Sequence, residues 1–443
     1  MKLRRAAAAA ALSAAVIAPL CSAPALATGA APSSAAAAPT QGERIPFSEL
    51  DASNAKARPG KSAAGAQADR TAAAGPDGTY HALSSSVRLL DTRNGNGSPV
   101  MLWPKGAIAL QVGGRGNVPS SGVSAVVMNL TAVGPTAGTW ITAWPSGGTE
   151  PRTSNLNVNA GETRANLVTV AVGADGKVNL RNANGHTHLL ADVVGYYSNA
   201  SGATGGGYHP EETPFRSYDS REAAWPWEAG EISNVPVPTP SMDPDTVDAV
   251  AVNVTAMSNC NGFLSVWGNY GGRPTTSTVN FLAGRPTPNL AVVPVIYDEI
   301  DDYPRINVYN SCGLTHVFFD VVGWYDWDAS GSTFTAVQPD RVLDTRLNNH
   351  GPVAGASTAF VPTAAVAPGA VSVVANVTGV SPTRDTWLGV AATSTKPNSS
   401  TLNLVPGENR PNLTHAPVSG TGFYVYNGAG STHVIADVFG YFH

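Results

Sequence analysis

From about residue 80 onward, short hydrophobic runs alternate with clusters of Gly, Pro, Asn and Asp. The runs are rich in Val, Leu, Thr and aromatic residues, which favour β-strands, and no stripe with the period of a helix continues through them. The chain from this point is therefore expected to be all-β. In the first part of the region the pattern predicts eight strands, at Val87–Leu90, Ala107–Val112, Ala125–Val133, Trp140–Trp144, Ser154–Val158, Leu167–Val172, Lys177–Arg181 and Leu189–Tyr197.

The same pattern of motifs occurs three times along the chain. Asp91 and Asp219 are 128 residues apart, and Asp219 and Asp344 are 125 apart, so the repeating unit has the size of a domain rather than of a solenoid turn. The motifs return in one order: RLLDTR, RSYDSR and RVLDTR; VVMNLTAV, VAVNVTAM and VVANVTGV; TSNLNV, TSTVNF and SSTLNL; AGETRANL, AGRPTPNL and PGENRPNL; HLLADVVGYY, HVFFDVVGWY and HVIADVFGYF.

These repeats predict three tandem β-sandwich-like domains, at 80–198, 208–326 and 334–443. Seven to eight short strands in about 115 residues are typical of a two-sheet sandwich. A closed barrel or a β-trefoil is the alternative for each unit. Stretches of small and polar residues at 199–207 and 328–332 are interpreted as linkers between the units.

The N-terminus has the pattern of an export signal. A basic MKLRR segment precedes an apolar run from Ala6 to Leu20, and Ala25-Leu26-Ala27 forms a cleavage site, so residues 1–27 are predicted to be a signal peptide. Residues 28–79 are rich in Ala, Gly, Ser and Pro and are interpreted as a flexible linker or pro-segment. The protein is expected to be secreted and extracellular, which includes association with the cell wall. No span is expected in the mature chain.

Two cysteines, Cys260 and Cys312, remain after loss of the signal peptide. An even number of cysteines in an exported protein predicts a disulfide, and closing a loop of this length stabilises the fold by about 4 kcal/mol on the chain-entropy model. A thiol pair for metal or redox chemistry is the alternative, but the spacing matches neither a zinc site nor a CxxC motif. No cofactor is expected.

An acidic residue lies in the middle of each unit's last strand, which is apolar on both faces. Asp192 is the first of these, and a buried carboxylate needs a partner, for which the Arg-x-x-Asp-x-Arg motif offers guanidinium groups. We interpret the set as structural Arg–Asp pairs that fix strand register, with a catalytic or ligand-binding carboxylate as the alternative. The set comprises Arg88, Asp91, Arg93 and Asp192; Arg216, Asp219, Arg221 and Asp320; and Arg341, Asp344, Arg346 and Asp437.

Other polar residues of the repeats offer weaker signals. His188 and Asp192 are four residues apart, which is about 13 Å along a strand and too far to share one metal ion, so no metal site is expected. Asn129 and Thr131 resemble a glycosylation sequon but are interpreted as hydrogen-bonding residues of the core. The chain contains no nucleophile elbow, HExxH or P-loop motif, so no catalytic residues are predicted and the protein is not expected to be an enzyme.

The combination of RVLDTR, NVT, SxLN and DVxGYF resembles a repeat family of secreted actinobacterial proteins. Units of that family look like accessory modules, alone or attached to exported enzymes such as peptidases and cell-wall amidases. The resemblance covers residues 80–443 and implies secretion and modularity rather than a mechanism. The second unit departs from the pattern, because RSYDSR replaces RVLDTR.

Composition narrows the function. Only 13% of residues are charged and the net charge is -5, which argues against nucleic-acid binding. The leading hypothesis is a non-enzymatic, multivalent, lectin-like protein that recognises cell-surface or extracellular carbohydrate, with Trp144, Trp225 and Trp227 as contacts. Trp140 and Trp387 occupy a matched position and are interpreted as core packing. The alternative is a structural or assembly component of the cell envelope, or of a secreted complex, that binds envelope or other protein partners.

Overall fold

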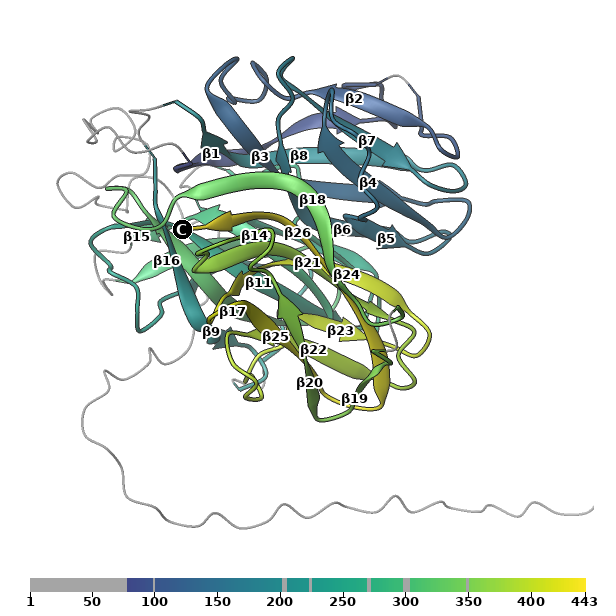
Figure 1. Cartoon of the computed structure of the whole chain (residues 1–443), viewed down its shortest axis with the longest axis vertical. Helices are drawn as coiled ribbons and strands as arrows, with labels where there is room; N and C mark the ends of the chain where they lie inside the picture. Colours follow the sequence, from purple (N-terminus) through teal and green to yellow (C-terminus); the bar gives the residue numbers. More distant parts are fainter. Residues whose placement is uncertain are drawn as a thin grey trace, which may run out of the picture. The chain divides into compact units, whose positions relative to one another are not determined.

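The computed structural model describes residues 78–98, 100–200, 205–222, 225–268, 272–297, 303–347 and 350–443. Strands, isolated bridges, turns and bends make up these ranges, and no helix occurs in them, which confirms the all-β prediction (Figure 1). It follows that none of the described segments is a long apolar helix able to cross a membrane. The predicted signal peptide, 1–27, and all but the last two residues of the segment 28–79 lie outside the described ranges.

We call residues 80–198, 208–326 and 334–443 repeats 1, 2 and 3. All eight strands expected in repeat 1 are present. Repeat 1 contains β1 (Tyr80–Asp91), β2 (Ala107–Gln111), β3 (Val123–Val133), β4 (Thr139–Pro145), β5 (Leu156–Val158), β6 (Thr163–Ala171), β7 (Lys177–Asn182) and β8 (His188–Ser198). Repeat 2 contains β9 (Tyr208–Asp219), β10 (Ile232–Pro236), β11 (Val247–Ser258), β12 (Gly262–Trp267), β13 (Val279–Phe281), β14 (Thr287–Pro294), β15 (Ile296–Tyr297), β16 (Pro304–Asn310) and β17 (Thr315–Asp326). Repeat 3 contains β18 (Phe334–Asp344), β19 (Val353–Ala354), β20 (Ser357–Pro362), β21 (Ser372–Val380), β22 (Thr386–Ala391), β23 (Leu402–Leu404), β24 (Asn409–Pro417), β25 (Gly422–Asn427) and β26 (Ser431–Phe442).

Each repeat contributes two small antiparallel sheets of the same topology. The inner sheets have the strand orders β1-β8-β3-β6, β9-β17-β11-β14 and β18-β26-β21-β24. The outer sheets have the orders β2-β7-β4-β5, β10-β16-β12-β13 and β20-β25-β22-β23, and the short strands β15 and β19 pair with β16 and β26. The last strand of each repeat lies in the interior of its inner sheet, as its apolar character predicts.

The inner and outer sheets of one repeat share a hydrophobic cluster. On β8, Leu189, Ala191 and Val193 belong to the cluster of repeat 1, together with Ile141 of the outer strand β4. Tyr197 of β8 faces the other way, into a second cluster to which all three repeats contribute. The inner strands are thus covered on both faces, which explains their near-continuous apolar sequences. The outer strand β7 keeps the alternation expected when only one face is buried.

The shared cluster corrects the expected arrangement. All three inner sheets supply it with buried side chains, for example Val127, Val292 and Val374, and the three repeats fall within one compact unit. The six small sheets therefore form a propeller-like ring whose inner sheets face a common centre, and not three tandem sandwiches. The expected linkers also take part in this packing, since Gly206 pairs with Tyr80 and Ser332 pairs with Tyr208.

Buried asparagines close the ring with hydrogen bonds that run from repeat to repeat. The Oδ1 of Asn289 accepts from the backbone N–H of Leu167 at 3.0 Å. The Oδ1 of Asn412 accepts from Leu290 at 3.3 Å, and the Oδ1 of Asn166 accepts from Leu413 at 3.1 Å. Repeat 1 thus donates a hydrogen bond to repeat 2, repeat 2 donates one to repeat 3, and repeat 3 donates one to repeat 1. We call Asn166, Asn289 and Asn412 the asparagine clamp.

The asparagines of the NLT and NVT motifs complete the clamp. Asn129 accepts from the Nδ2 of Asn289 at 2.9 Å and donates to the carbonyl of Ser277, both in repeat 2. Asn129 is only 3% exposed, so the sequon-like motif lies in the core. The two other repeats form the equivalent bonds, from Asn412 to Asn253 and from Asn166 to Asn376.

Aromatic residues from the start and end of each repeat form one cluster in the shared core. It consists of Tyr80, Tyr197, Tyr208, Tyr325, Phe334 and Phe442, with stacked pairs such as Tyr197–Phe334 at 4.1 Å between ring centroids. The repeated Gly of the DVxGY motif is needed here, because a Cβ on Gly195, Gly323 or Gly440 would overlap the ring of Tyr80, Tyr208 or Phe334. We call these six residues the aromatic cluster.

A buried network of opposite charges also joins the repeats. The guanidinium of Arg164 contacts Glu162 of its own repeat at 2.6 Å and Glu408 of repeat 3 at 2.7 Å. Glu408 also binds Arg410 at 2.8 Å, and Arg410 donates to the carbonyl of Pro286 in repeat 2. Burial, followed by repulsion from Arg164, lowers the pKa of Arg410 to about 10. Repeat 2 has Arg285 and Thr287 where the others have Glu and Arg, so the network is not threefold.

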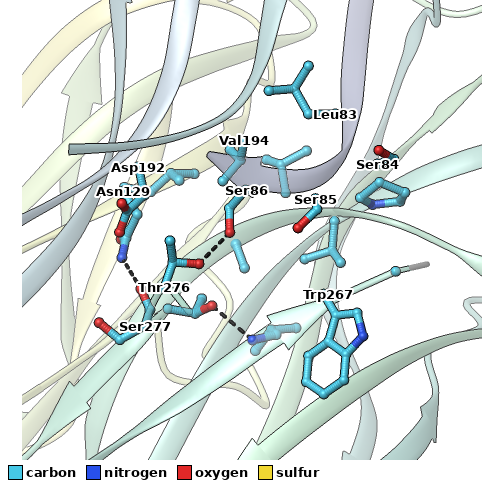
Figure 2. Close-up of a pocket in the computed structure, with 18 residues that line it drawn as sticks. Leu83, Ser84, Ser85, Ser86, Asn129, Asp192, Val194, Trp267, Thr276 and Ser277 are labelled. Carbon is cyan, nitrogen blue, oxygen red and sulfur yellow. Dashed lines mark hydrogen bonds between the residues drawn. The ribbon is translucent and has the colours of Figure 1, made fainter. Parts of the chain in front are cut away.

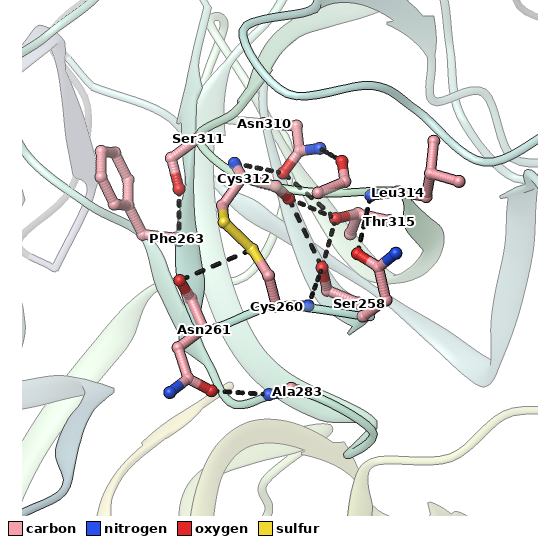
Figure 3. Close-up of a disulfide and its surroundings, with 12 residues drawn as sticks. Ser258, Cys260, Asn261, Phe263, Ala283, Asn310, Ser311, Cys312, Leu314 and Thr315 are labelled. Atoms are coloured by element: carbon pink, nitrogen blue, oxygen red, sulfur yellow. Dashed lines mark hydrogen bonds between the residues drawn. A yellow bond between two sulfur atoms is a disulfide. The ribbon is translucent and has the colours of Figure 1, made fainter.

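Cys260 and Cys312 form a disulfide in repeat 2, as predicted (Figure 3). Their Cα atoms are 6.2 Å apart, and the bridge joins the turn after β11 to the turn before β17. The hydroxyl of Ser258 accepts from the N–H of Cys260, and Asn310 Oδ1 accepts from the N–H of Cys312. The bridge therefore fixes a connection that hydrogen bonds already order.

The asparagine clamp makes a prediction about cooperativity. The variant Asn289→Ala leaves the N–H of Leu167 and the carbonyl oxygens of Asn129 and Thr278 without a partner, at a cost of about 3 kcal/mol. Because the bonds to Leu167 and Asn129 cross between repeats, calorimetry of the full chain should show a single unfolding transition that shifts as a whole. A matched control is Asn157→Ala, whose side chain accepts from Ser154 of the same repeat. Three separate transitions, with only one shifted, would contradict the shared fold.

His415 predicts a loss of stability in mild acid. Its ring contacts Tyr208 of the aromatic cluster, it is 1% exposed, and neither ring nitrogen has a hydrogen-bond partner among the described residues. Burial lowers the pKa of this imidazole from 6.5 to about 3. The unfolded chain therefore binds a proton below pH 6.5 that the folded chain does not, so the free energy of unfolding falls as the pH drops from 6.5 towards 3. At pH 5 the loss is about 2 kcal/mol.

The chain provides the control for this effect, since the equivalent of His415 is Thr169 in repeat 1 and Val292 in repeat 2. Denaturant unfolding of the wild type and of His415→Val should be compared at pH 7 and pH 5. The variant is expected to lose about 2 kcal/mol less between the two. His81, whose pKa burial lowers to about 4, is present in both proteins and cancels. If the wild type and the variant lose the same free energy of unfolding between pH 7 and pH 5, His415 is not the responsible group.

Candidate functional site

The first candidate is the repeated Arg–Asp set, which the structure assembles in one place in each repeat. Arg88 of β1 lies opposite Asp192 of β8, and its guanidinium donates to both carboxylate oxygens at 2.7 and 2.9 Å. Asp91 accepts from Arg93 at 2.7 and 2.9 Å and from Arg88 at 3.4 Å. Repeats 2 and 3 form the same contacts, with Arg216, Asp219, Arg221 and Asp320, and with Arg341, Asp344, Arg346 and Asp437.

The charges of this set are balanced inside the fold. Asp192 is 1% exposed, and burial raises the pKa of its carboxyl while the two hydrogen bonds from Arg88 act in the opposite direction. The hydrogen bond from the Arg93 side chain is the main cause that lowers the pKa of Asp91 to about 2. Each carboxylate thus binds a guanidinium of its own repeat, an arrangement that favours a structural role.

The repeated histidines each have a hydroxyl group of their own repeat as hydrogen-bond partner. Nδ1 of His188 lies 3.1 Å from the hydroxyl of Thr92, the threonine of the RLLDTR motif. His316 and His433 form the same contact, with Ser220 and Thr345. Within the described ranges, no three His, Cys, Asp or Glu side chains are grouped so that they could hold a metal.

A small pocket lies between repeats 1 and 2, next to the Arg–Asp set (Figure 2). Ser86 and Thr276 hydrogen-bond across it, with Asn129 and Asp192 close by. Its volume of about 30 Å³ is enough for one water molecule and too small for a sugar ring. This pocket is not a ligand site of useful size.

Two of the three predicted tryptophan contacts are wrong. Trp144 is 7% exposed, and its indole N–H donates to the carbonyl of Gly148 in the loop that follows β4. Trp227 is 3% exposed and packs in the core of repeat 2, beside Phe319. Neither indole can offer a face to a ligand. Trp225 is 57% exposed, so the prediction for that residue remains open.

The matched position on the outer sheets, which the sequence suggested to be core, is instead open to solvent in repeat 1. Trp140 of β4 is 43% exposed and lines a groove of about 280 Å³. Lys105, Glu150, Arg152 and Arg181 line the same groove, and Arg181 forms an ion pair with Glu150. An indole surrounded by hydrogen-bonding and charged groups has the composition of a binding site rather than of a core.

Trp387, the equivalent residue of repeat 3, also lines a groove. This second groove has a volume of about 310 Å³ and lies where repeat 3 meets repeat 2. Arg285 of repeat 2 and Asp385 of repeat 3 line it together with the buried Arg410. The Trp387 ring lies 5.1 Å from that of Tyr426, and the ammonium of Lys396 is 5.9 Å from its centre.

Repeat 2 has Phe263 at the matched position. Its ring lies 6.0 Å from that of Tyr309, and the guanidinium of Arg273 stacks 3.8 Å from the centre of the Tyr309 ring. The position is thus aromatic in all three repeats, but its polar neighbours differ. Sequence reasoning identified the match and missed its exposure.

No family model matches the chain, and no curated protein matches its sequence. Among solved structures, a triple jelly roll protein from the turret of an archaeal virus aligns over 83% of this chain and 89% of its own, with 10% identity and a TM-score of 0.17. The tandem CBM22-1–CBM22-2 domain of Xyn10C from Paenibacillus barcinonensis aligns over 55% and 99%, with 10% identity and a TM-score of 0.17. A structure of Sulfolobus turreted icosahedral virus aligns over 82% and 91%, with 8% identity and a TM-score of 0.17. Likenesses this weak carry no argument about the function.

The Arg–Asp set predicts a large effect on stability. Asp192→Ala leaves the guanidinium of Arg88 with only its 3.4 Å contact to Asp91. Because Arg88 is also 21% exposed, the cost should be about 3 kcal/mol, at the lower end for a broken buried pair. Asp175→Ala removes the partner of Lys177 in an exposed pair and should change stability far less than Asp192→Ala, because solvent screens such pairs. Urea unfolding measures both. Equal stability of Asp192→Ala and the wild type would reopen the catalytic alternative.

Proposed function

We propose that this protein is a secreted, non-enzymatic protein that binds extracellular carbohydrate through grooves on its outer sheets. The supporting observation is that the matched Trp140 and Trp387 each line a groove of about 300 Å³ together with charged side chains. An indole face suits the apolar face of a sugar ring, and the polar neighbours suit its hydroxyl groups. The proposal keeps the lectin-like class of the sequence prediction and changes the residues.

Secretion is part of the proposal and has two supports. The first 27 residues have the pattern of an export signal. The disulfide between Cys260 and Cys312 is typical of proteins that leave the reducing cytosol. The resemblance of the repeats to secreted accessory modules agrees with this reading.

The non-enzymatic part of the proposal rests on how the repeated polar residues are used. In each repeat the carboxylates bind guanidinium groups of the same repeat, and the clamp asparagines bind backbone groups of a neighbouring repeat. Residues that recur because the fold needs them leave the differing outer sheets to supply specificity. Two grooves in one molecule can also combine weak sites by avidity.

An exposed apolar stretch favours the alternative, a structural or assembly component that binds protein partners. Val100, Met101 and Trp103 are 56%, 37% and 63% exposed and follow one another before β2. Protein interfaces are enriched in such residues. This stretch serves as the comparison in the binding experiment.

Mutation can distinguish carbohydrate binding by the grooves from protein binding by the apolar stretch. Trp140→Ala and Trp387→Ala should each weaken binding to cell-surface polysaccharide about tenfold, since about 1.4 kcal/mol of lost stacking corresponds to that factor. The double variant should bind less than either single variant. Pull-down on purified polysaccharide, with melting temperature as a folding check, is the measurement.

The control for this experiment is Trp103→Ala, which removes an exposed indole outside both grooves and should leave polysaccharide binding unchanged. Binding that survives the double groove variant would refute the carbohydrate proposal. Loss of a protein partner from Trp103→Ala alone would support the assembly role.

A further inference from the structure

The two grooves differ in charge, and this difference bears on the ligand. In the Trp140 groove, Arg181 and Glu150 neutralise each other as an ion pair. Lys105 and Arg152 line the same groove, are exposed, and have no acidic partner among the described residues. The groove therefore carries an excess of two positive charges on a chain whose net charge is -5.

The Trp387 groove has no such excess. Arg410 is paired with Glu408 at 2.8 Å, and Arg285 is balanced by Asp385 on the lining of the groove. The ammonium of Lys396 lies 5.9 Å from the centre of the Trp387 ring, but Lys396 does not line the groove. The outer sheets thus offer one cationic groove and one with balanced charge, although both are built on the same strand position.

We propose that the Trp140 groove binds an anionic sugar residue, with the indole against the sugar ring and with Lys105 and Arg152 facing a carboxylate or phosphate group. The inference deepens, and rests on, the carbohydrate-binding function proposed above. Arg and Lys differ in what they add: the planar fork of Arg152 matches two oxygens of one anion, and Lys105 acts as a point charge. Arg181 remains held by Glu150 and shapes the wall of the groove.

Because Arg181 is paired with Glu150, the charges of Lys105 and Arg152 are the ones that determine which ligands the site prefers. A neutral sugar would leave the charges of Lys105 and Arg152 without a bound counter-ion, whereas an anionic residue neutralises them. The attraction acts near the surface, so it should weaken as salt is added.

The test uses the full mature chain and three probes of equal length: an oligogalacturonate, a mannose-phosphate oligosaccharide and a neutral manno-oligosaccharide. Calorimetric titration should show at least tenfold tighter binding of one or both anionic probes than of the neutral probe. Their comparison distinguishes a carboxylate from a phosphate source. Arg152→Gln should remove about tenfold of affinity for the anionic probe and weaken binding of the neutral probe much less.

A matched control is Lys177→Gln, which removes one positive charge outside both grooves and should not affect the preference. The outcomes separate the two proposals. If anionic and neutral probes bind equally and only Trp140→Ala weakens binding, the charge inference is overturned and the carbohydrate function stands. If none of the probes, nor polysaccharide, binds to the wild type, both proposals fail. If Arg152→Gln binds the anionic probe like the wild type, the assigned residue is wrong.

Discussion

The structure depends on one constraint: amide groups buried between the repeats must find partners, and those partners lie in the next repeat. The asparagine clamp meets this constraint three times in a closed circuit, from Leu167 to Asn289, from Leu290 to Asn412 and from Leu413 to Asn166. A single repeat on its own would leave the backbone N–H of the leucine and the side-chain amide of the asparagine without partners in an apolar setting. A small domain can rarely tolerate that cost in free energy of unfolding. The repeats are therefore parts of one fold.

The other repeated motifs follow from this arrangement. The inner strands are buried on both faces because they lie between their own outer sheet and the shared core. A strand in that place cannot solvate a carboxylate, so Asp192 needs Arg88 on the neighbouring strand, and Gly195 must be small because Tyr80 lies against it. Most of the polar residues that recur in the sequence are used in this way. Function is then expected where the repeats differ, on the outer sheets.

Much of the fold could be predicted from the sequence, because the signals are local. The eight strands of repeat 1, the disulfide and a guanidinium partner for Asp192 all follow from residues within one repeat. The ring could not be predicted in this way. Asn289 and its partner Leu167 are more than a hundred residues apart, and nothing in the sequence of either motif indicates that the two residues are in contact. The exposure of the tryptophans was predicted wrongly for a related reason. Trp140 and Trp144 share a strand face, but the turn at Gly148 covers only the second.

The departures from threefold symmetry carry the most information. The repeats share a scaffold, yet Glu162 and Glu408 correspond to Arg285, and Arg164 and Arg410 correspond to Thr287. If all three repeats carried this glutamate and this arginine, the three junctions between repeats could form the same ion pairs. The substitution at Arg285 places an extra cation where repeat 2 meets repeat 3, which makes that junction different from the other two. Arg285 lines the Trp387 groove, whereas Lys105 and Arg152 line the Trp140 groove, so one molecule presents two different surfaces built on one strand position.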